Sequence, residues 1–299
     1  MTTALTEPVC IACGSSNSVI FCSDKSRTIR HCHSCNLLFV FPQPDQASLH
    51  REFQFDYFGG DRRPGETRLE LEFELWRQRT LLRIVERLRR FKCGGKLLDV
   101  GCASGEIFEH FRNENWELYG LEPSAMAFKR AEQRFGDDPR VHLFNAYLGE
   151  VKLELRSFDV ITVLESLYYM SDPRRELSCL ARLLKDDGIL AIAVPGYTYQ
   201  RLRHGGPFGY LINGRGCSLT RSHLFYFSER SMDNLLESQG FRILATVQLG
   251  SSDYGNQFWR FARRMYLTFT RAVGGLTLGH LNLAPHVLYL CGKSNTLPS

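Results

Sequence analysis

The stretch 97–106, LLDVGCASGE, decides the fold of this 299-residue chain. A short apolar run with the character of a buried strand leads directly into a turn that carries Gly101 and Gly105. Glycine has no Cβ, so the chain can bend sharply there and a ligand can approach its backbone. A dinucleotide fingerprint requires a second and a third glycine, but Ala103 stands at the second position and the third glycine is absent. The turn therefore favours a ligand without a pyrophosphate.

Apolar runs alternate with helical patterns on both sides of this turn. The strands are expected at 96–100, 116–122, 141–146, 158–165, 189–195, 241–249 and 286–293, and the helices between them at 101–115, 124–135, 172–185 and 228–240. Such alternation is typical of a parallel sheet that binds ligands at the carboxyl ends of its strands. We predict an α/β fold with a Rossmann-like, doubly wound, seven-stranded sheet.

The remaining segments divide the chain. Residues 1–45 are predicted to form a zinc ribbon, and 46–92 a linker that ends in a long amphipathic helix. Residues 93–299 form the α/β domain, with cap insertions at 196–228 and 250–284. The second insertion contains a helical pattern around 257–272.

Composition narrows the class of protein. The apolar share is 43%, the charged share 23% and the net charge +5, which describe a globular protein with no strong demand for an anionic partner. The longest apolar runs fall short of the roughly 20 residues that a membrane span needs, and the first residues do not resemble a secretory signal. We expect a cytoplasmic protein whose ten cysteines include a metal site rather than a disulfide framework.

Two Cys-x2-Cys pairs mark the metal site. Cys10 and Cys13 form one pair, Cys32 and Cys35 the other, with eighteen residues between them. Four thiolates at this spacing suit a closed tetrahedral zinc site, which is structural because no position is left for a substrate. The residues after each pair, Gly14 and Asn36, are expected to adopt a positive φ in tight turns.

Two acidic residues point to the ligand. Glu122 closes the second strand in YGLEPS, where a carboxylate can accept hydrogen bonds from both hydroxyls of a ribose. Asp99, near the end of the first strand, faces the same crevice.

Four segments together carry a family resemblance: LLDVGCASG (97–105), YGLEPS (119–124), FDVITVLESLYYMSDP (158–173) and LLKDDGILAIAVP (183–195). In this order they resemble the class I S-adenosylmethionine-dependent methyltransferases. The leader with its four cysteines is similar to that of a bacterial subgroup with an N-terminal zinc ribbon, and the resemblance extends over most of residues 8–245. Residues 250–284 match nothing that we recognise.

The resemblance implies a role for each matching residue. Gly101, Ala103 and Gly105 would line the methionine part of S-adenosylmethionine, and Asp99 would hold its ammonium group. Glu122 would bind the ribose, with Pro123, Asn145 and Ala146 near the adenine. Leu164 and Glu165 would lie beside the sulfonium.

The chain departs from the subgroup at one functional position. A Glu-His pair usually follows the fourth strand there, and this chain has Tyr168 and Tyr169. We therefore consider Tyr168, Tyr169 and His223 as candidates for proton transfer, because histidine titrates near neutral pH. Packing against the cofactor or the lid is the alternative role of all three.

The expected function is methyl transfer to a small-molecule acceptor, with O-methylation favoured over N- and C-methylation. The aromatic residues of the 257–272 helix favour a lid or a dimer helix that covers a hydrophobic or aromatic acceptor. Contact with a membrane surface and simple core packing are the alternative roles of this helix. An RNA methyltransferase that binds its substrate through the ribbon is a rival, although we do not expect a nucleic-acid partner. A non-catalytic scaffold is the second rival, and the protein is expected to be a monomer or homodimer.

Overall fold

The computed structural model describes residues 7–23, 27–45, 48–49, 51, 68–112, 115–204, 219, 223–250, 257–276 and 282–294. Its main element is a seven-stranded sheet in the order β10-β11-β8-β7-β4-β5-β6. These strands are β4 (Gly95–Val100), β5 (Trp116–Leu121), β6 (Val141–Phe144), β7 (Phe158–Leu164), β8 (Leu184–Pro195), β10 (Phe241–Leu249) and β11 (His286–Lys293). Strands β4 to β8 pair in parallel, and β11 runs antiparallel to both of its neighbours. The predicted Rossmann-like sheet is therefore confirmed, with one strand reversed.

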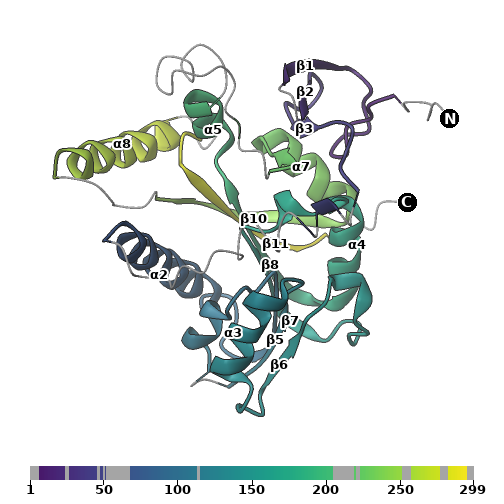
Figure 1. The fold of residues 1–299 in the computed structure, drawn as a ribbon, viewed down its shortest axis with the longest axis vertical. Helices are drawn as coiled ribbons and strands as arrows, with labels where there is room; N and C mark the ends of the chain where they lie inside the picture. Colours follow the sequence, from purple (N-terminus) through teal and green to yellow (C-terminus); the bar gives the residue numbers. More distant parts are fainter. Residues whose placement is uncertain are drawn as a thin grey trace.

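Helices cover both faces of this sheet (Figure 1). On one face lie α2 (Arg68–Leu88), the 3-10 helix η2 (Glu106–His110) and α3 (Ala125–Phe135), which share an apolar core with alternate residues of β4, β5 and β7. On the other face lie α4 (Pro173–Leu183) and α7 (Glu229–Ser238), in a second core. The two cores bury both faces of the central strands, as a doubly wound fold requires.

A smaller four-stranded sheet contains the N-terminal segment. Its strands are β1 (Ser18–Ser23), β2 (Thr28–Cys32), β3 (Leu38–Val40) and, beside β3, β9 (Phe225–Tyr226), which lies between α5 (Tyr197–His204) and α7 in the sequence. Leu38 pairs with Tyr226 and Phe39 with Phe225. The hydroxyl of Ser228 also donates to the carbonyl of Cys35 at 2.6 Å. The N-terminal segment is thus packed against the rest of the molecule and is not a separate module joined only by a linker.

Several elements differ from the sequence prediction. The helix expected within 101–115 is only the short η2, because positive φ angles at Gly101, Ala103 and Gly105 delay its start. The helix expected at 172–185 ends at Leu183, where β8 already begins. The first insertion contains α5. Two short 3-10 helices that were not predicted, η3 (Leu148–Glu150) and η4 (Leu167–Tyr169), lie before it in the sequence. The second contains α8 (Gln257–Leu276). Parts of both predicted insertions, 205–218, 220–222, 251–256 and 277–281, lie outside the described residues.

Among the described helices, none combines the length and the apolar character that a membrane crossing needs.

Candidate functional site

The glycine turn after β4 has the backbone that the sequence predicts. Gly101, Ala103 and Gly105 all have positive φ, at 81°, 49° and 74°. A Cβ on Gly101 would lie 2.8 Å from the Cβ of Ser166, and one on Gly105 would lie 2.8 Å from the ring of Phe135. Side chains are therefore excluded at both glycines, and the main chain of the turn is left close to the carboxyl ends of β4, β5 and β7.

The carboxylate of Glu122 is held against this turn. Glu122 lies directly after β5 and is 5% exposed. One oxygen accepts from the amide of Ala103 at 2.9 Å and the other from the amide of Ser124 at 2.8 Å. Burial raises the pKa of Glu122, although both amide hydrogen bonds oppose the shift. Since a carboxylate has about four acceptor positions, this fixed group can still accept hydrogen bonds from a ligand.

Asp99 lies on the same edge of the sheet, also 5% exposed. Its Oδ1 accepts from the hydroxyl of Thr162 on β7 at 2.6 Å. Burial raises the pKa of Asp99 to about 7, and the nearby carboxyl groups of Glu106 and Glu122 add to the shift. Such a group gains from a cationic ligand, because a positive charge restores its ionised form.

The other predicted cofactor residues surround these two carboxyl groups. Asn145, just after β6, donates from Nδ2 to the main-chain carbonyl of Glu122 at 2.8 Å. Ala146 follows Asn145, Pro123 follows Glu122, and Leu164 is the last residue of β7, packed against the core beneath α2. All of the predicted cofactor residues therefore lie at the carboxyl edge of β4 to β7.

Glu165 follows β7 and pairs with a histidine that the sequence analysis missed. Its Oε1 lies 2.9 Å from Nδ1 of His286, and its Oε2 accepts from the hydroxyl of Tyr168 at 2.9 Å. Burial opposes ionisation of both groups. The charge of His286 nevertheless lowers the pKa of Glu165, and the charge of Glu165 raises the pKa of His286. Glu165 has a φ of 55°, an unfavourable conformation for a residue with a side chain.

The position of His286 follows from the reversal of β11. Because that strand is antiparallel to β8, its first residue, His286, pairs with Pro195, the last residue of β8. His286 therefore reaches the same edge as the carboxyl ends of the parallel strands. In the sequence, His286 is marked only by its position at the start of the last predicted strand. That position predicts a site residue only if the strand is known to run antiparallel to its neighbour.

His223 lies in an aromatic cluster beside this pair. Its ring centroid is 4.3 Å from that of Tyr168, 5.3 Å from that of Tyr169 and 5.4 Å from that of Tyr226. The amide of Leu224 donates to the carbonyl of Tyr168 at 3.0 Å, which ties the cluster to η4. The structure thus brings together the three residues predicted for proton transfer and places Tyr168 between His223 and Glu165.

The four predicted metal ligands form a compact cluster. The sulfur atoms of Cys10, Cys13, Cys32 and Cys35 all lie within 4.8 Å of one another. The Cys10–Cys35 distance is 3.5 Å and the Cys13–Cys32 distance 3.6 Å. A tetrahedral zinc site with Zn–S bonds of about 2.3 Å needs S–S distances of roughly 3.8 Å, so the cluster fits a zinc ion.

Two further features of this cluster suit a metal. Gly14 and Asn36 have the expected positive φ, at 73° and 63°. The hydrogen bond between Cys10 and Cys35 lowers the pKa of Cys10 to about 5 and raises the pKa of Cys35, whereas a metal would bind all four cysteines as thiolates. The cluster is mostly buried in the same core as α4 and α7, a position that suits a structural ion.

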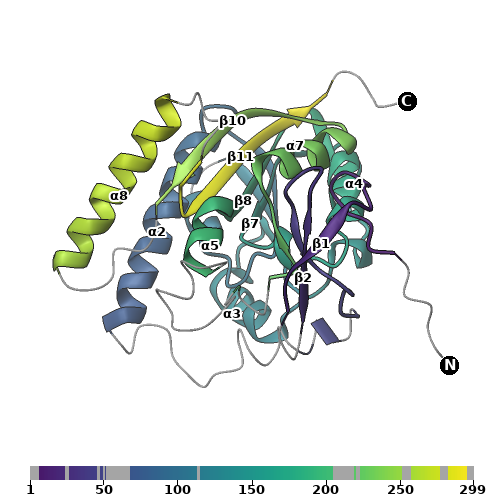
Figure 2. The ribbon, with the colours of Figure 1, turned by 90° about the horizontal axis from the view of Figure 1, so that it is seen from above.

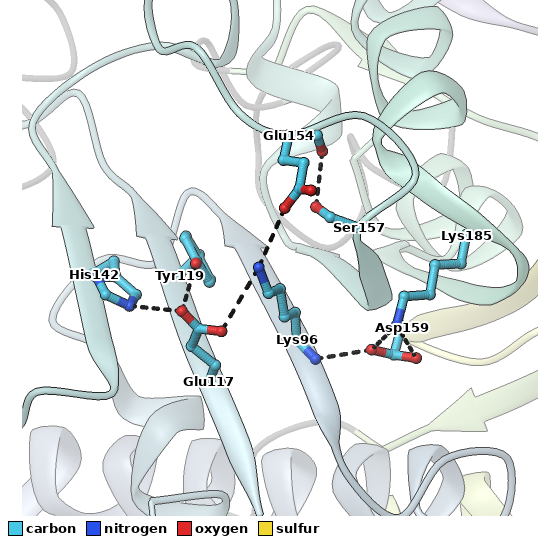
Figure 3. A network of polar contacts seen from close by, with 8 residues as sticks. All are labelled: Lys96, Glu117, Tyr119, His142, Glu154, Ser157, Asp159 and Lys185. Atoms are coloured by element: carbon cyan, nitrogen blue, oxygen red, sulfur yellow. Dashed lines mark hydrogen bonds and ion pairs between the residues drawn. The ribbon is translucent and has the colours of Figure 1, made fainter.

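A different polar network occupies the opposite edge of the large sheet (Figure 3). Lys96, Glu117, His142, Asp159 and Lys185 are each the second residue of a parallel strand. Glu117 accepts from Tyr119 at 2.6 Å and pairs with His142 at 3.0 Å and with Lys96 at 3.7 Å. Asp159 accepts from the Lys96 amide at 2.9 Å and pairs with Lys185 at 2.8 Å. Here the acidic groups have basic partners.

Comparison with known proteins agrees with the geometry of the carboxyl edge. The family model for methyltransferase domains matches residues 73–246, more than half of the chain. A ubiquinone biosynthesis O-methyltransferase of Bos taurus is 25% identical over 181 residues, which are 59% of this chain and 49% of that protein. A tRNA U34 carboxymethyltransferase of Tolumonas auensis is 34% identical over 100 residues, 32% of this chain and 30% of that protein. The chain thus spans about half the length of such relatives or less.

A solved structure supports the same fold. The magnesium protoporphyrin IX methyltransferase of Synechocystis PCC 6803, determined with bound S-adenosylhomocysteine, superposes with a TM-score of 0.56. It is 15% identical, over 84% of this chain and 100% of that chain. Together with the match of the family model over the glycine turn and both buried carboxyl groups, this places the chain in the family of methyltransferase domains.

Proposed function

We propose that this protein transfers a methyl group from S-adenosylmethionine to a small-molecule acceptor, with oxygen as the favoured acceptor atom. The observation that carries the proposal is the glycine turn enclosed by two buried carboxyl groups with raised pKa values, Asp99 and Glu122. The names of the relatives support methyl transfer, and the ubiquinone O-methyltransferase supports oxygen.

The site residues fit this cofactor in charge and in shape. Glu122, fixed by two amides, would accept hydrogen bonds from the ribose, and Asp99 would face the ammonium group. The open main chain at Gly101, Ala103 and Gly105 would line the methionine part. Pro123, Asn145 and Ala146 would flank the adenine, and Leu164 and Glu165 the sulfonium. When bound, the cofactor supplies a methyl group on a positively charged sulfur atom, so that the chain has to align the acceptor and accept its proton.

Two histidines can accept that proton. His286 is oriented by Glu165, whose carboxylate fixes the imidazole ring. His223, with Tyr168 and Tyr169, forms the neighbouring aromatic wall. We assign proton acceptance to His286 and acceptor packing to the wall, which suits a hydrophobic or aromatic molecule. The reverse assignment is the alternative.

Zinc has a structural part in this proposal. Cys10, Cys13, Cys32 and Cys35 would hold one ion with no open position. The ion would fix β3, and through the pairing of β3 with β9 it would hold the segment that carries His223.

The RNA alternative has one supporting observation, the relative that acts as a tRNA U34 carboxymethyltransferase. Binding to RNA through phosphate contacts would weaken steeply with salt. Methyl transfer to an RNA acceptor with such a dependence, and none to quinol or phenol acceptors, would favour this alternative. The scaffold alternative requires that the protein bind no S-adenosylmethionine, or bind it without turnover on any acceptor.

The decisive experiment is calorimetry with S-adenosylhomocysteine. Glu122→Ala removes the carboxylate and should weaken binding by about 1–3 kcal/mol, the range for a lost hydrogen bond to a charged group. Glu117→Ala, at the opposite edge of the sheet, is the matched control and should leave the affinity unchanged. No titration with the wild type, or equal affinities for wild type and Glu122→Ala, would contradict the proposed cofactor site.

A further inference from the structure

Helix α8 carries a row of exposed apolar side chains. Phe261, Met265, Phe269 and Leu276 are 63%, 55%, 56% and 86% exposed. They are spaced by four, four and seven residues, which places them on one face of an α-helix. Isolated exposed apolar residues are common on proteins, but a contiguous row on one helix face marks a contact surface.

The orientation of this row is fixed by contacts on another face of the helix. The hydroxyl of Tyr266 donates to the carbonyl of Leu283 at 2.6 Å, and the ring of Tyr266 lies 6.0 Å from that of Tyr199. Thr270 is buried. The helix is therefore attached to the body through Tyr266 and Thr270, and the apolar row is directed away from it. Figures 1 and 2 both place α8 at the periphery of the molecule.

These contacts decide between the roles considered for this helix. Simple core packing would bury the row, and a lid would direct it toward the carboxyl edge of the sheet. Neither agrees with side chains that are more than half exposed. None of the described residues covers the row, which leaves it available to a partner outside the chain.

The charge of the helix indicates the chemistry of that partner. Its sequence, QFWRFARRMYLTFTRAVGGL, contains four arginines and neither an acidic residue nor a lysine. A second copy of the chain, packed helix to helix, would add four more arginines and no acidic residue of α8 to balance them. An anionic lipid surface offers both an apolar layer for the row and negative head groups for the arginines.

We propose that α8 docks this protein on the surface of an anionic lipid bilayer. The helix lies in the plane of the interface, with the row of Phe261, Met265, Phe269 and Leu276 inserted below the head groups. A helix of 20 residues is about 30 Å long, so it offers an extended contact without crossing the bilayer. The proposal does not rest on the proposed function, because it uses no residue of the cofactor site.

The test is co-sedimentation of the full chain with vesicles. The wild type should bind vesicles of phosphatidylcholine mixed with phosphatidylglycerol at least about tenfold more tightly than vesicles of phosphatidylcholine alone, and salt should weaken the binding. The double variant Phe261→Ser/Phe269→Ser should lose at least about tenfold of this affinity, since two inserted apolar side chains are removed.

The matched control is Leu155→Ser, which removes an apolar residue that is 62% exposed on a different surface. It should bind vesicles as the wild type does, and circular dichroism should show that every variant is folded. No binding to anionic vesicles, or equal binding by the double variant, overturns the proposal. A concentration-dependent dimer in sedimentation velocity that the double variant abolishes, without vesicle binding, would also overturn it in favour of a second copy.

Discussion

The two edges of the large sheet each hold a histidine–glutamate pair, and the surroundings of the two pairs differ. At the amino edge, His142 lies 3.0 Å from Glu117, with Tyr119 and Lys96 on the same carboxylate. At the carboxyl edge, His286 lies 2.9 Å from Glu165, close to carboxyl groups that burial leaves with raised pKa values. The nitrogen–oxygen distances of the two pairs are nearly equal, but the groups around the pairs differ.

The pKa shifts of Glu117, Asp99 and Glu122 differ between the two edges. At the amino edge, the hydrogen bond from Tyr119 lowers the pKa of Glu117, and Lys96 and His142 act in the same direction. At the carboxyl edge, burial raises the pKa values of Asp99 and Glu122. A buried acid with a raised pKa, such as Asp99 or Glu122, would gain from a ligand that brings a cation or hydrogen-bond donors. Glu165 differs from these two acids, because the charge of His286 lowers its pKa.

The largest expected effect compares two glycines at the ends of β4. Gly95 has a φ of 121°, and a Cβ there would lie 2.1 Å from Oδ2 of Asp159. Gly95→Ala should lower the free energy of unfolding by about 3–4 kcal/mol, because it adds backbone strain and breaks the buried Asp159 contacts. Urea unfolding measures this loss.

Gly101→Ala is the matched variant at the other end. Its Cβ would lie 2.8 Å from the Cβ of Ser166, so the stability loss should be smaller, and the affinity for S-adenosylhomocysteine should fall at least about tenfold, roughly 1.4 kcal/mol. The comparison fails if Gly95→Ala, under conditions where it is folded, loses more cofactor affinity than Gly101→Ala.

The next effect distinguishes the two histidines in catalysis. His286→Asn should reduce kcat by about a hundredfold or more, the usual contribution of a general base, and His142→Asn should leave kcat unchanged. Both variants should bind S-adenosylhomocysteine as the wild type does. A loss of activity in His223→Asn with an active His286→Asn would assign proton acceptance to His223 instead.

The pH profile gives a second readout of this pair. A general base acts when deprotonated, so activity should rise with pH through the pKa of His286, which Glu165 holds above its ordinary value. Glu165→Gln removes that charge and should move the rising limb of the profile to lower pH. A limb that stays in place would exclude His286 as the titrating base.

A smaller effect concerns the stability of the cofactor-free protein. The pKa of Asp99 is about 7 in the folded chain and near 3.8 when the chain is unfolded. The folded state therefore binds the extra proton, and stability should fall as pH rises from about 4 to 7. Asp99→Asn retains an acceptor for Thr162 and removes this titration, so its stability should stay level where that of the wild type falls. A variant that runs parallel to the wild type across this range would show that Asp99 is ionised at little cost.

The smallest effect belongs to the exposed part of the amino-edge network. Lys96→Met removes the contacts of Nζ with Glu117 and Glu154 but keeps the amide hydrogen bond to Asp159. Because these ion pairs are open to solvent, we expect a loss of less than about 1 kcal/mol in thermal unfolding, smaller still at high salt. A larger loss, or a change in cofactor affinity, would remove the distinction between the two edges.

The sequence predicted the carboxyl edge better than the amino edge for a physical reason. Gly101, Gly105 and Glu122 lie within or just after apolar runs, so local spacing alone places them at strand ends. The Glu165–His286 contact and the network around Glu117 join residues that lie on different strands and depend on the strand order. The Glu165–His286 contact also requires that β11 be reversed. The 3-10 form of η2 also depends on the backbone angles of the preceding turn, which the sequence pattern indicates only in part.

The pairing of β9 with the N-terminal segment limits which changes in sequence the fold can accept. Ser228 and Cys35 are 193 residues apart in sequence and joined by one hydrogen bond, and the cysteine cluster shares its core with the segment around Phe225. A chain that lacked residues 1–45 would leave β9 without its partner strand β3 and exposed as a sheet edge, which invites self-association. A ribbon taken from a related chain would have to preserve the contacts of residues 223–228, so the two distant stretches constrain each other.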